Sequence, residues 1–248
     1  IKNGDCYEIN YCVEGFAENV RLQPLPVYQK LNGISPAPFS AFYKNQHRYM
    51  MCASMERYLC KRGSELLSQP IKGTIRRGAT TDADEAQKNK LYNSIKDRAE
   101  NVMIVDLVRN DLARCCEQGS VAVKELYGIY TFPQVHQMIS TVSGTLARDR
   151  KFTDALRYTF PMGSMTGAPK IIVTKLADRY ELSRRELYSG TVGYITPEGD
   201  FDFNVVIRSM FYNEETRYLS YHTGGAITYD SAAEDEWDEM RLKASAIE

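Results

Sequence analysis

The sequence predicts an α+β fold with largely antiparallel sheets. Segments rich in β-branched and aromatic residues come in blocks, and segments with helical spacing separate these blocks. Short turn sequences such as "PEGD" (197–200) and "NEET" (213–216) connect neighbouring strand segments. Blocks of strands followed by blocks of helices are typical of this fold class. The 248 residues show no repeat, linker or composition break, so we expect a single domain over residues 1–248.

The first third of the chain is predicted to consist mostly of strands. "DCYEINYCVEGF" (5–16) alternates in the manner of a strand, and "PLPVYQKLNG" (24–33) follows as a short helix that ends at Gly33. A hairpin meander is the simplest arrangement of the next four strand-like runs. These runs are 38–44, 48–54, 56–62 and 65–71.

Two long helices are predicted in the middle of the chain. Thr81 or Asp82 caps the first helix, which runs to about Asp97. The second, "ENVMIVDLVRNDLARCC" (100–116), has apolar residues near helical spacing, although its short apolar run also suits a buried strand. Gly119 ends this region.

The second half of the chain returns to strands and contains three further helices. The helices are "FTDALRYTF" (152–160), "GAPKIIVTKLADRY" (167–180) and a last helix that opens with "SAAE", in which Ser231 and Glu234 fit a capping box. The predicted strands are 120–130, 134–146, 188–196, 201–212 and 217–228.

Composition excludes several classes of function. The net charge is −1 and no long run of lysine or arginine occurs, so nothing indicates nucleic-acid binding. No apolar run is long enough to span a membrane. The six cysteines form no C-x-x-C pair, which predicts reduced, structural thiols in a cytoplasmic protein. The chain begins with Ile1, and we expect it to lack an N-terminal extension.

Two acidic pairs are candidate metal ligands. Asp97 and Glu100 are three residues apart, as are Glu236 and Glu239, so each pair shares a helix face. Together the pairs would offer the oxygen ligands that Mg²⁺ prefers. Solvated helix faces are the alternative, and Lys243 would then form an ordinary surface ion pair with Glu239.

Three glycine-containing stretches suggest contacts with a ligand. "FPMGSMTGAPK" (160–170) leads into a helix whose first N–H groups could bind a carboxylate, and it lacks the spacing of a P-loop. "HTGGAI" (222–227) would let the backbone approach a ligand closely. In "SQPIKGTIRRG" (68–78), Lys72 lies between fixed backbone positions and is either a solvated loop lysine or an amine held for chemistry.

Six stretches, taken in order, resemble the chorismate-utilising enzymes, a family that includes anthranilate, aminodeoxychorismate, isochorismate and salicylate synthases. They are "PIKGTIRRG", "KDRAENVMIVDLVRNDL", "FPMGSMTGAPK", "YSGTVGYI", "FNVVIRS" and "GGAITYDSAAEDEWDEMRLKA". The resemblance covers nearly the whole chain and implies a four-layer α/β/β/α sandwich of two packed, largely antiparallel sheets with outer helices. It also implies chorismate as the substrate and Mg²⁺ as the cofactor.

The resemblance implies roles for the acidic residues. Glu100 and Glu239 would bind Mg²⁺ directly, and Asp97 and Glu236 would act through water. The metal would bind the C1 carboxylate of chorismate, and Lys243 would lie near that carboxylate.

The resemblance also implies contacts with the rest of the substrate. Arg208 and Tyr188 would bind the pyruvyl carboxylate, for which a planar guanidinium is well suited. The other implied substrate contacts are Gly224, Thr74 and Ser164, the last at a position where the family commonly has threonine.

Two further residues would act in catalysis. His136 in "PQVHQMIS" matches an active-site histidine of the family, with a satisfied histidine on a half-buried strand as the alternative. Glu56 in "SMERY" corresponds to the glutamate of a Ser-Pro-Glu-Arg pattern and would be the general acid for the departing C4 hydroxyl. That role needs a protonated carboxyl. Met55 replaces the proline, so the backbone constraint before Glu56 is lost.

Lys72 occupies the position at which the family divides. Alanine there leaves room for ammonia or water to attack C2 of chorismate. A lysine can itself attack C2, after which ammonia attacks C4 and gives 4-amino-4-deoxychorismate. The attacking amine must be neutral, and a desolvated site would lower its pKa toward that state.

The resemblance, with lysine at position 72, therefore implies a chorismate-aminating enzyme on the route to 4-aminobenzoate and folate. No glutaminase pattern is visible, so a glutamine amidotransferase subunit would deliver ammonia. The alternatives are an anthranilate-synthase-like enzyme, a non-catalytic chorismate-binding subunit, and an unrelated α+β protein with acidic helix faces.

Overall fold

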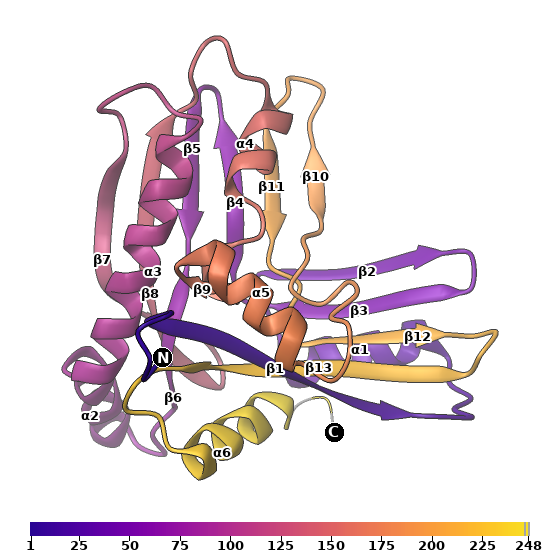
Figure 1. Ribbon diagram of the computed structural model, residues 1–248. Helices are drawn as coiled ribbons and strands as arrows, with labels where there is room; N and C mark the ends of the chain where they lie inside the picture. The colour runs from indigo at the N-terminus through magenta and orange to yellow at the C-terminus, as the bar shows by residue number, and fades with distance from the viewer. Residues whose placement is uncertain (246, 248) are drawn as a thin grey trace. The chain divides into compact units, whose positions relative to one another are not determined.

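The computed structural model describes residues 1–245 and 247 (Figure 1). Its contacts divide the chain into two compact units. Unit 1 comprises Ile1–Met55, Met165–Val192 and Val205–Glu248, and unit 2 comprises Glu56–Ser164 and Gly193–Asn204. The expectation of a single domain over residues 1–248 stays a prediction.

Unit 1 contains a six-stranded antiparallel sheet in the order β2-β3-β12-β13-β1-β9 (Figure 1). Three helices pack on these strands: α1 on β2 and β3, α5 on β1 and β9, and α6 on β13. The strands are β1 (Glu8–Ala17), β2 (Phe39–Asn45), β3 (Arg48–Ser54), β9 (Gly167–Ala168), β12 (Ser209–Asn213) and β13 (Tyr218–Ile227). The helices are α1 (Pro24–Ile34), α5 (Lys170–Tyr180) and α6 (Ala233–Ala244).

Unit 2 contains a seven-stranded antiparallel sheet in the order β10-β11-β4-β5-β8-β6, with β7 paired to β8. The helices α2 and α3 pack on β6, β7 and β8, and α4 packs on α3. The strands are β4 (Arg57–Arg62), β5 (Glu65–Gln69), β6 (Ile71–Arg76), β7 (Ala122–Thr131), β8 (Val135–Thr145), β10 (Gly193–Ile195) and β11 (Phe201–Asn204). The helices are α2 (Thr81–Tyr92), α3 (Ile95–Ala113) and α4 (Phe152–Thr159).

Strand β8 belongs to the core of unit 2, since nearly all of its residues are buried. Successive side chains of a strand point to opposite faces of the sheet. Ser140 Oγ donates to Asn101 Oδ1 of α3 at 2.5 Å, so His136, Met138 and Ser140 face the helices. Gln137 and the other odd-numbered residues of β8 therefore face the opposite side.

The predicted α+β class with two antiparallel sheets is confirmed, as is the order of strand and helix blocks. All six cysteines are unpaired and buried, as expected for structural thiols. No helix among the described residues has the length and apolar character needed to cross a membrane.

The predicted first long helix is wrong at both of its ends. Thr80 is the N-cap of α2, since its side chain accepts a hydrogen bond from Ala83 N at 3.2 Å. That helix ends at Tyr92, and Ser94 caps a new helix by accepting from Asp97 N at 3.3 Å. A serine side chain that bonds to the following backbone can end one helix and begin the next. Asp97 therefore lies in the first turn of α3.

The predicted capping box at Ser231 and Glu234 is also wrong. The N-cap of α6 is Ala232, and Ser231 Oγ donates instead to Glu236 Oε1 at 2.7 Å. The long strands predicted at 188–196 and 201–212 are shorter in the structure. Segments 188–192 and 205–208 lie outside the strands, and they contain Tyr188 and Arg208.

Candidate functional site

Lys72 lies at a β-bulge in β6. Ile71 pairs with Ile139 and Thr74 pairs with Gln137, so Lys72 and Gly73 together oppose the single residue Met138. A bulge leaves the extra residue out of the regular ladder and redirects side chains locally. Lys72 is only 9% exposed, so it is not a solvated loop lysine.

The backbone at this bulge can approach α3 closely because residue 73 is glycine. Its φ of +98° lies in the region that side chains of L-residues rarely adopt. A Cβ on Gly73 would lie 3.1 Å from Asp97 Oδ1 and 3.1 Å from Leu91 Cδ1. The backbone next to Lys72 therefore packs directly against the first turn of α3, which contains Asp97 of the predicted acidic pair Asp97 and Glu100.

The predicted acidic pairs have different surroundings in the two units. In unit 2, Glu100 is buried, and Lys96 Nζ lies 4.0 Å from its Oε1. In unit 1, Glu236 is buried and lies next to β13, since a Cβ on Gly225 would be 3.2 Å from Glu236 Oε2. Glu100 and Glu236 therefore differ from the solvated helix faces of the alternative interpretation, whereas Glu239, whose side chain is 44% exposed, forms the ion pair with Lys243 that this alternative expects.

Glu239 belongs to a short polar chain in unit 1. Its Oε1 lies 2.6 Å from Lys243 Nζ, which also donates to the carbonyl of Gly224 at 3.0 Å. Gly224 is buried, and a Cβ there would lie 2.7 Å from Cys12 Sγ. The resemblance assigns Glu239 and Lys243 to the metal-bound carboxylate of the substrate and Gly224 to a further substrate contact.

The donor set suits a hard cation such as Mg²⁺, because all four predicted ligands are carboxylates. Asp97 and Glu100 belong to unit 2, and Glu236 and Glu239 belong to unit 1. Within the part of the chain that the structure describes, no group of three or more His, Cys, Asp or Glu side chains is arranged to hold a metal ion. A metal shared by the two pairs stays a prediction.

Arg208 has the environment expected of an anion-binding residue. Burial lowers the pKa of its guanidinium, and Tyr188 is the group nearby that opposes this shift. The described residues contain no carboxylate that pairs with Arg208. An unpaired buried charge is unfavourable, and a negatively charged ligand would compensate it.

The backbone brings Tyr188 and Arg208 together within unit 1. Ser189 N donates to Val206 O at 2.9 Å, and Val206 N donates to Gly190 O at 2.9 Å. Ser189 and Arg208 have φ of +65° and +51°, which is unusual for residues other than glycine. Strained backbone of this kind is concentrated at functional sites. The Tyr188 ring stacks on His222 at 5.3 Å.

Arg185 holds this region together and was missed in the sequence. It pairs with Glu181 and donates to three further groups. These are Met165 O at 2.6 Å, Asn10 O at 2.8 Å and Ser189 Oγ at 3.3 Å. The spacing of Glu181 and Arg185 was the only local signal, because the other partners are distant in the sequence.

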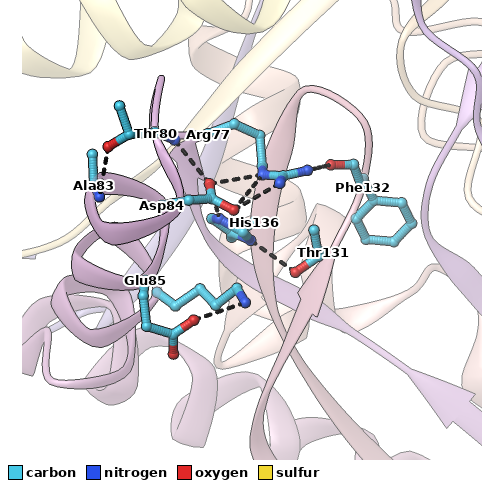
Figure 2. A network of polar contacts seen from close by, with 10 residues as sticks. Arg77, Thr80, Ala83, Asp84, Glu85, Thr131, Phe132 and His136 are labelled. Carbon is cyan, nitrogen blue, oxygen red and sulfur yellow. Dashed lines mark hydrogen bonds and ion pairs between the residues drawn. The ribbon is translucent and has the colours of Figure 1, made fainter.

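His136 lies in a polar network of unit 2 that Figure 2 shows. It is completely buried. Its Nε2 lies 2.8 Å from Asp84 Oδ1 and its Nδ1 lies 3.0 Å from Thr131 Oγ1. Both ring nitrogens are therefore engaged, as the alternative interpretation of His136 expects. A direct catalytic role stays a prediction, and it would require one of these bonds to break.

Asp84 is the centre of the same network. Arg77 donates to both of its carboxylate oxygens, and Gly78 N donates to Oδ1 at 2.8 Å (Figure 2). The hydrogen bonds from Arg77, followed by those from Gly78 and His136, hold the pKa of Asp84 well below its usual range. The network ties the end of β6 to α2 and β8.

We expect the substitution Asp84→Asn to reduce the pH dependence of stability in acid. A carboxyl whose pKa is lowered by folding stabilises the protein above its unfolded pKa of about 3.9, and this contribution is lost as the pH falls. The variant should have a lower free energy of unfolding at pH 7 and a smaller loss between pH 5 and pH 3. Urea denaturation at these pH values measures both quantities.

The matched control for this substitution is Glu85→Gln. Glu85 is the next residue of α2 and forms an exposed ion pair with Lys88 at 3.0 Å. Its removal should change stability little. An acid response of Asp84→Asn equal to that of the control would contradict the expectation.

The remaining predicted residues are placed as follows. Glu56 is buried and directly precedes β4, and Ser164 is buried and follows α4 in the chain. Thr74 is exposed on β6, opposite Gln137. The structure brings predicted residues together within each unit: Lys72 with the start of α3, and Tyr188 with Arg208.

The profile of the chorismate binding enzyme family matches residues 1–248. The chain therefore belongs to the chorismate-binding enzyme family. It is 42% identical over 249 residues to one relative, aminodeoxychorismate synthase, chloroplastic, of Arabidopsis thaliana. This match covers 99% of the present chain and 27% of the relative. It is 38% identical over 247 residues to aminodeoxychorismate synthase component 1 of Escherichia coli strain K12, which covers 100% of this chain and 54% of the relative.

A solved structure agrees with this family. Anthranilate synthase component I from Streptococcus pneumoniae matches with a TM-score of 0.89 and 30% identity, over 100% of this chain and 55% of that chain. The chain spans about half of the length of the Escherichia coli relative and about a quarter of the length of the plant relative.

Proposed function

We propose that this protein acts as component I of aminodeoxychorismate synthase and converts chorismate and ammonia to 4-amino-4-deoxychorismate. The observation that carries the proposal is Lys72, a buried amine at a β-bulge whose backbone packs against the acidic helix α3. The similarity of nearly the whole of this chain to parts of relatives named aminodeoxychorismate synthase supports the same product.

In the first step, the neutral amine of Lys72 attacks C2 of chorismate. The ring double bonds shift, the C4–O bond breaks, and Glu56 donates a proton to the departing hydroxyl, which leaves as water. The products are a secondary ammonium that joins Lys72 to C2, and the carboxylate of Glu56. This step requires a protonated carboxyl at Glu56, whose side chain is buried.

In the second step, ammonia attacks C4 and the double bonds shift back. The C2–N bond breaks, and its electron pair returns to Lys72, which leaves as a neutral amine. The product carries an ammonium group at C4. Glu56 takes up a proton from solvent, so the two steps together exchange the C4 hydroxyl for an amino group.

The two carboxylates of chorismate need separate anchors. Arg208 would bind the pyruvyl carboxylate through two parallel hydrogen bonds, and Tyr188 would donate a third. Mg²⁺, held by Glu100 and Glu239 with Asp97 and Glu236 acting through water, would neutralise the C1 carboxylate. Gly224, Thr74, Ser164 and Lys243 are the proposed additional substrate contacts.

A glutaminase subunit would supply the ammonia. The name "component 1" of the bacterial relatives indicates that those enzymes have two components. We extend this to the present chain as a proposal, with a glutamine amidotransferase as the partner. A cytoplasmic location stays a prediction.

Product analysis tests the proposal. The whole enzyme is incubated with chorismate, Mg²⁺ and ammonium at raised pH, and products are separated by chromatography. We expect 4-amino-4-deoxychorismate, and a mass spectrum of the trapped protein should place an adduct on Lys72. Anthranilate as the product would favour an anthranilate-synthase-like enzyme and contradict the proposal. Absence of chorismate binding by calorimetry would point to a different function.

A further inference from the structure

Arg57 follows Glu56 directly and connects four neighbouring strands of unit 2. Its Nε and Nη2 donate to the two carboxylate oxygens of Asp202 on β11, at 2.9 Å and 3.0 Å. Its Nη1 donates to Gln69 Oε1 on β5 at 2.7 Å. Gln69 Nε2 in turn donates to Thr141 Oγ1 on β8 at 3.1 Å. A continuous polar row therefore crosses β11, β4, β5 and β8.

The backbone pairing around Arg57 is irregular on both sides. The register between β4 and β11 shifts between Phe203 and Asn204, and the register between β4 and β5 shifts between Arg57 and Cys60. Such shifts interrupt the ladder locally, so backbone hydrogen bonds alone hold this point less firmly. The residue before Glu56 is Met55, which imposes none of the constraint of a proline.

The side chain of Arg57 ties this point of β4 to both neighbouring strands. A two-bond pair between guanidinium and carboxylate fixes orientation as well as distance. The Asp202 side chain is 9% exposed, so solvent screens this pair little. The third bond, to Gln69, fixes Arg57 from the opposite side.

We propose that Arg57 is the positioning residue of Glu56. By tying the first residue of β4 to β11 and β5, Arg57 sets the place of the Glu56 carboxyl, one residue earlier. This inference rests on the proposed function only in so far as Glu56 protonates the departing C4 hydroxyl. A general acid that is displaced by about 1 Å loses roughly 10²-fold in rate.

The test compares Arg57→Met and Arg57→Lys with Lys61→Met in the whole enzyme. Lys61 is the matched control, since it also lies on β4 and forms an ion pair, at 3.3 Å, with Asp200, the residue directly before β11. Consumption of chorismate with Mg²⁺ and ammonium gives kcat and KM over a range of pH, and thermal unfolding gives the stability of each variant.

We expect Arg57→Met to lower kcat roughly 10²-fold, with KM changed by less than about threefold. The fall of kcat at high pH should flatten, because the residual reaction no longer depends on protonated Glu56. Arg57→Lys keeps the charge without the two-bond geometry and should fall between wild type and Arg57→Met. Lys61→Met should stay within about twofold of wild type.

A kcat and pH profile of Arg57→Met equal to those of wild type or of Lys61→Met would overturn the inference. Where Arg57→Met fails to fold, Asp202→Asn keeps the shape of the partner and should produce the same flattened pH profile. A wild type that forms anthranilate contradicts the proposed function and leaves this test valid, since the C4 hydroxyl must depart in both reactions.

Discussion

Replacing Lys72 with alanine is expected to lower the formation of 4-amino-4-deoxychorismate on the order of 10³-fold or more, as is common when a covalent nucleophile is removed. Without the amine, nothing is tethered to attack C2. The space that the side chain leaves would admit ammonia or water, so residual turnover should shift toward products substituted at C2. Chromatography of the reaction mixture measures both effects.

The substitution Lys72→Met separates the two parts of this expectation. Methionine removes the amine but fills most of the space, so neither the normal product nor products substituted at C2 should form at an appreciable rate. Chorismate binding, measured by calorimetry, should persist in both variants. Normal product at the wild-type rate from Lys72→Ala would exclude the covalent role of Lys72.

Replacing Arg208 with methionine is expected to lower kcat/KM without lowering the stability of the folded protein. Loss of a buried charged hydrogen bond to the substrate carboxylate costs about 2–5 kcal/mol, which lowers kcat/KM by roughly 30- to 5000-fold. The folded protein should be as stable as wild type or more stable, because the guanidinium is buried without a carboxylate partner among the described residues. Steady-state kinetics and urea denaturation measure the two effects.

Arg208→Lys is the matched variant for this experiment. It keeps a positive charge but cannot form two parallel hydrogen bonds, so its affinity for chorismate should recover only in part. A marked loss of stability in Arg208→Met, together with an unchanged kcat/KM, would assign Arg208 a structural role and contradict its role in binding.

The order of strands and helices could be predicted from local patterns, and the errors lie at informative places. The aromatic and β-branched residues of 188–192 and 205–208 favour strands, yet both segments leave the sheets. Ser189 and Arg208 adopt positive φ there, which no local preference indicates. Conflict between local preference and structure is expected where the surrounding contacts serve a function.

The candidate site was predictable in its residue types and less so in its geometry. Spacing alone left the acidic pairs ambiguous, and the burial of Glu100 and Glu236 became known only from the structure. Most partners of Arg185 and Arg57 are distant in the sequence, so no motif singled out the roles of their side chains. His136 likewise bonds to Asp84, which lies in another element.

The bulge in β6 also determines which changes in chain length the protein can tolerate. Deleting one residue at Lys72 or Gly73 would restore a regular ladder and turn every later side chain of β6 to the opposite face of the sheet. Arg77 would then point away from Asp84, and the link between β6 and α2 would be lost. We therefore expect β6 to tolerate an exchange of the side chain at position 72 better than a change in the number of its residues. If Lys72 acts as proposed, a single codon, rather than a remodelled loop, would change which nucleophile reaches the substrate.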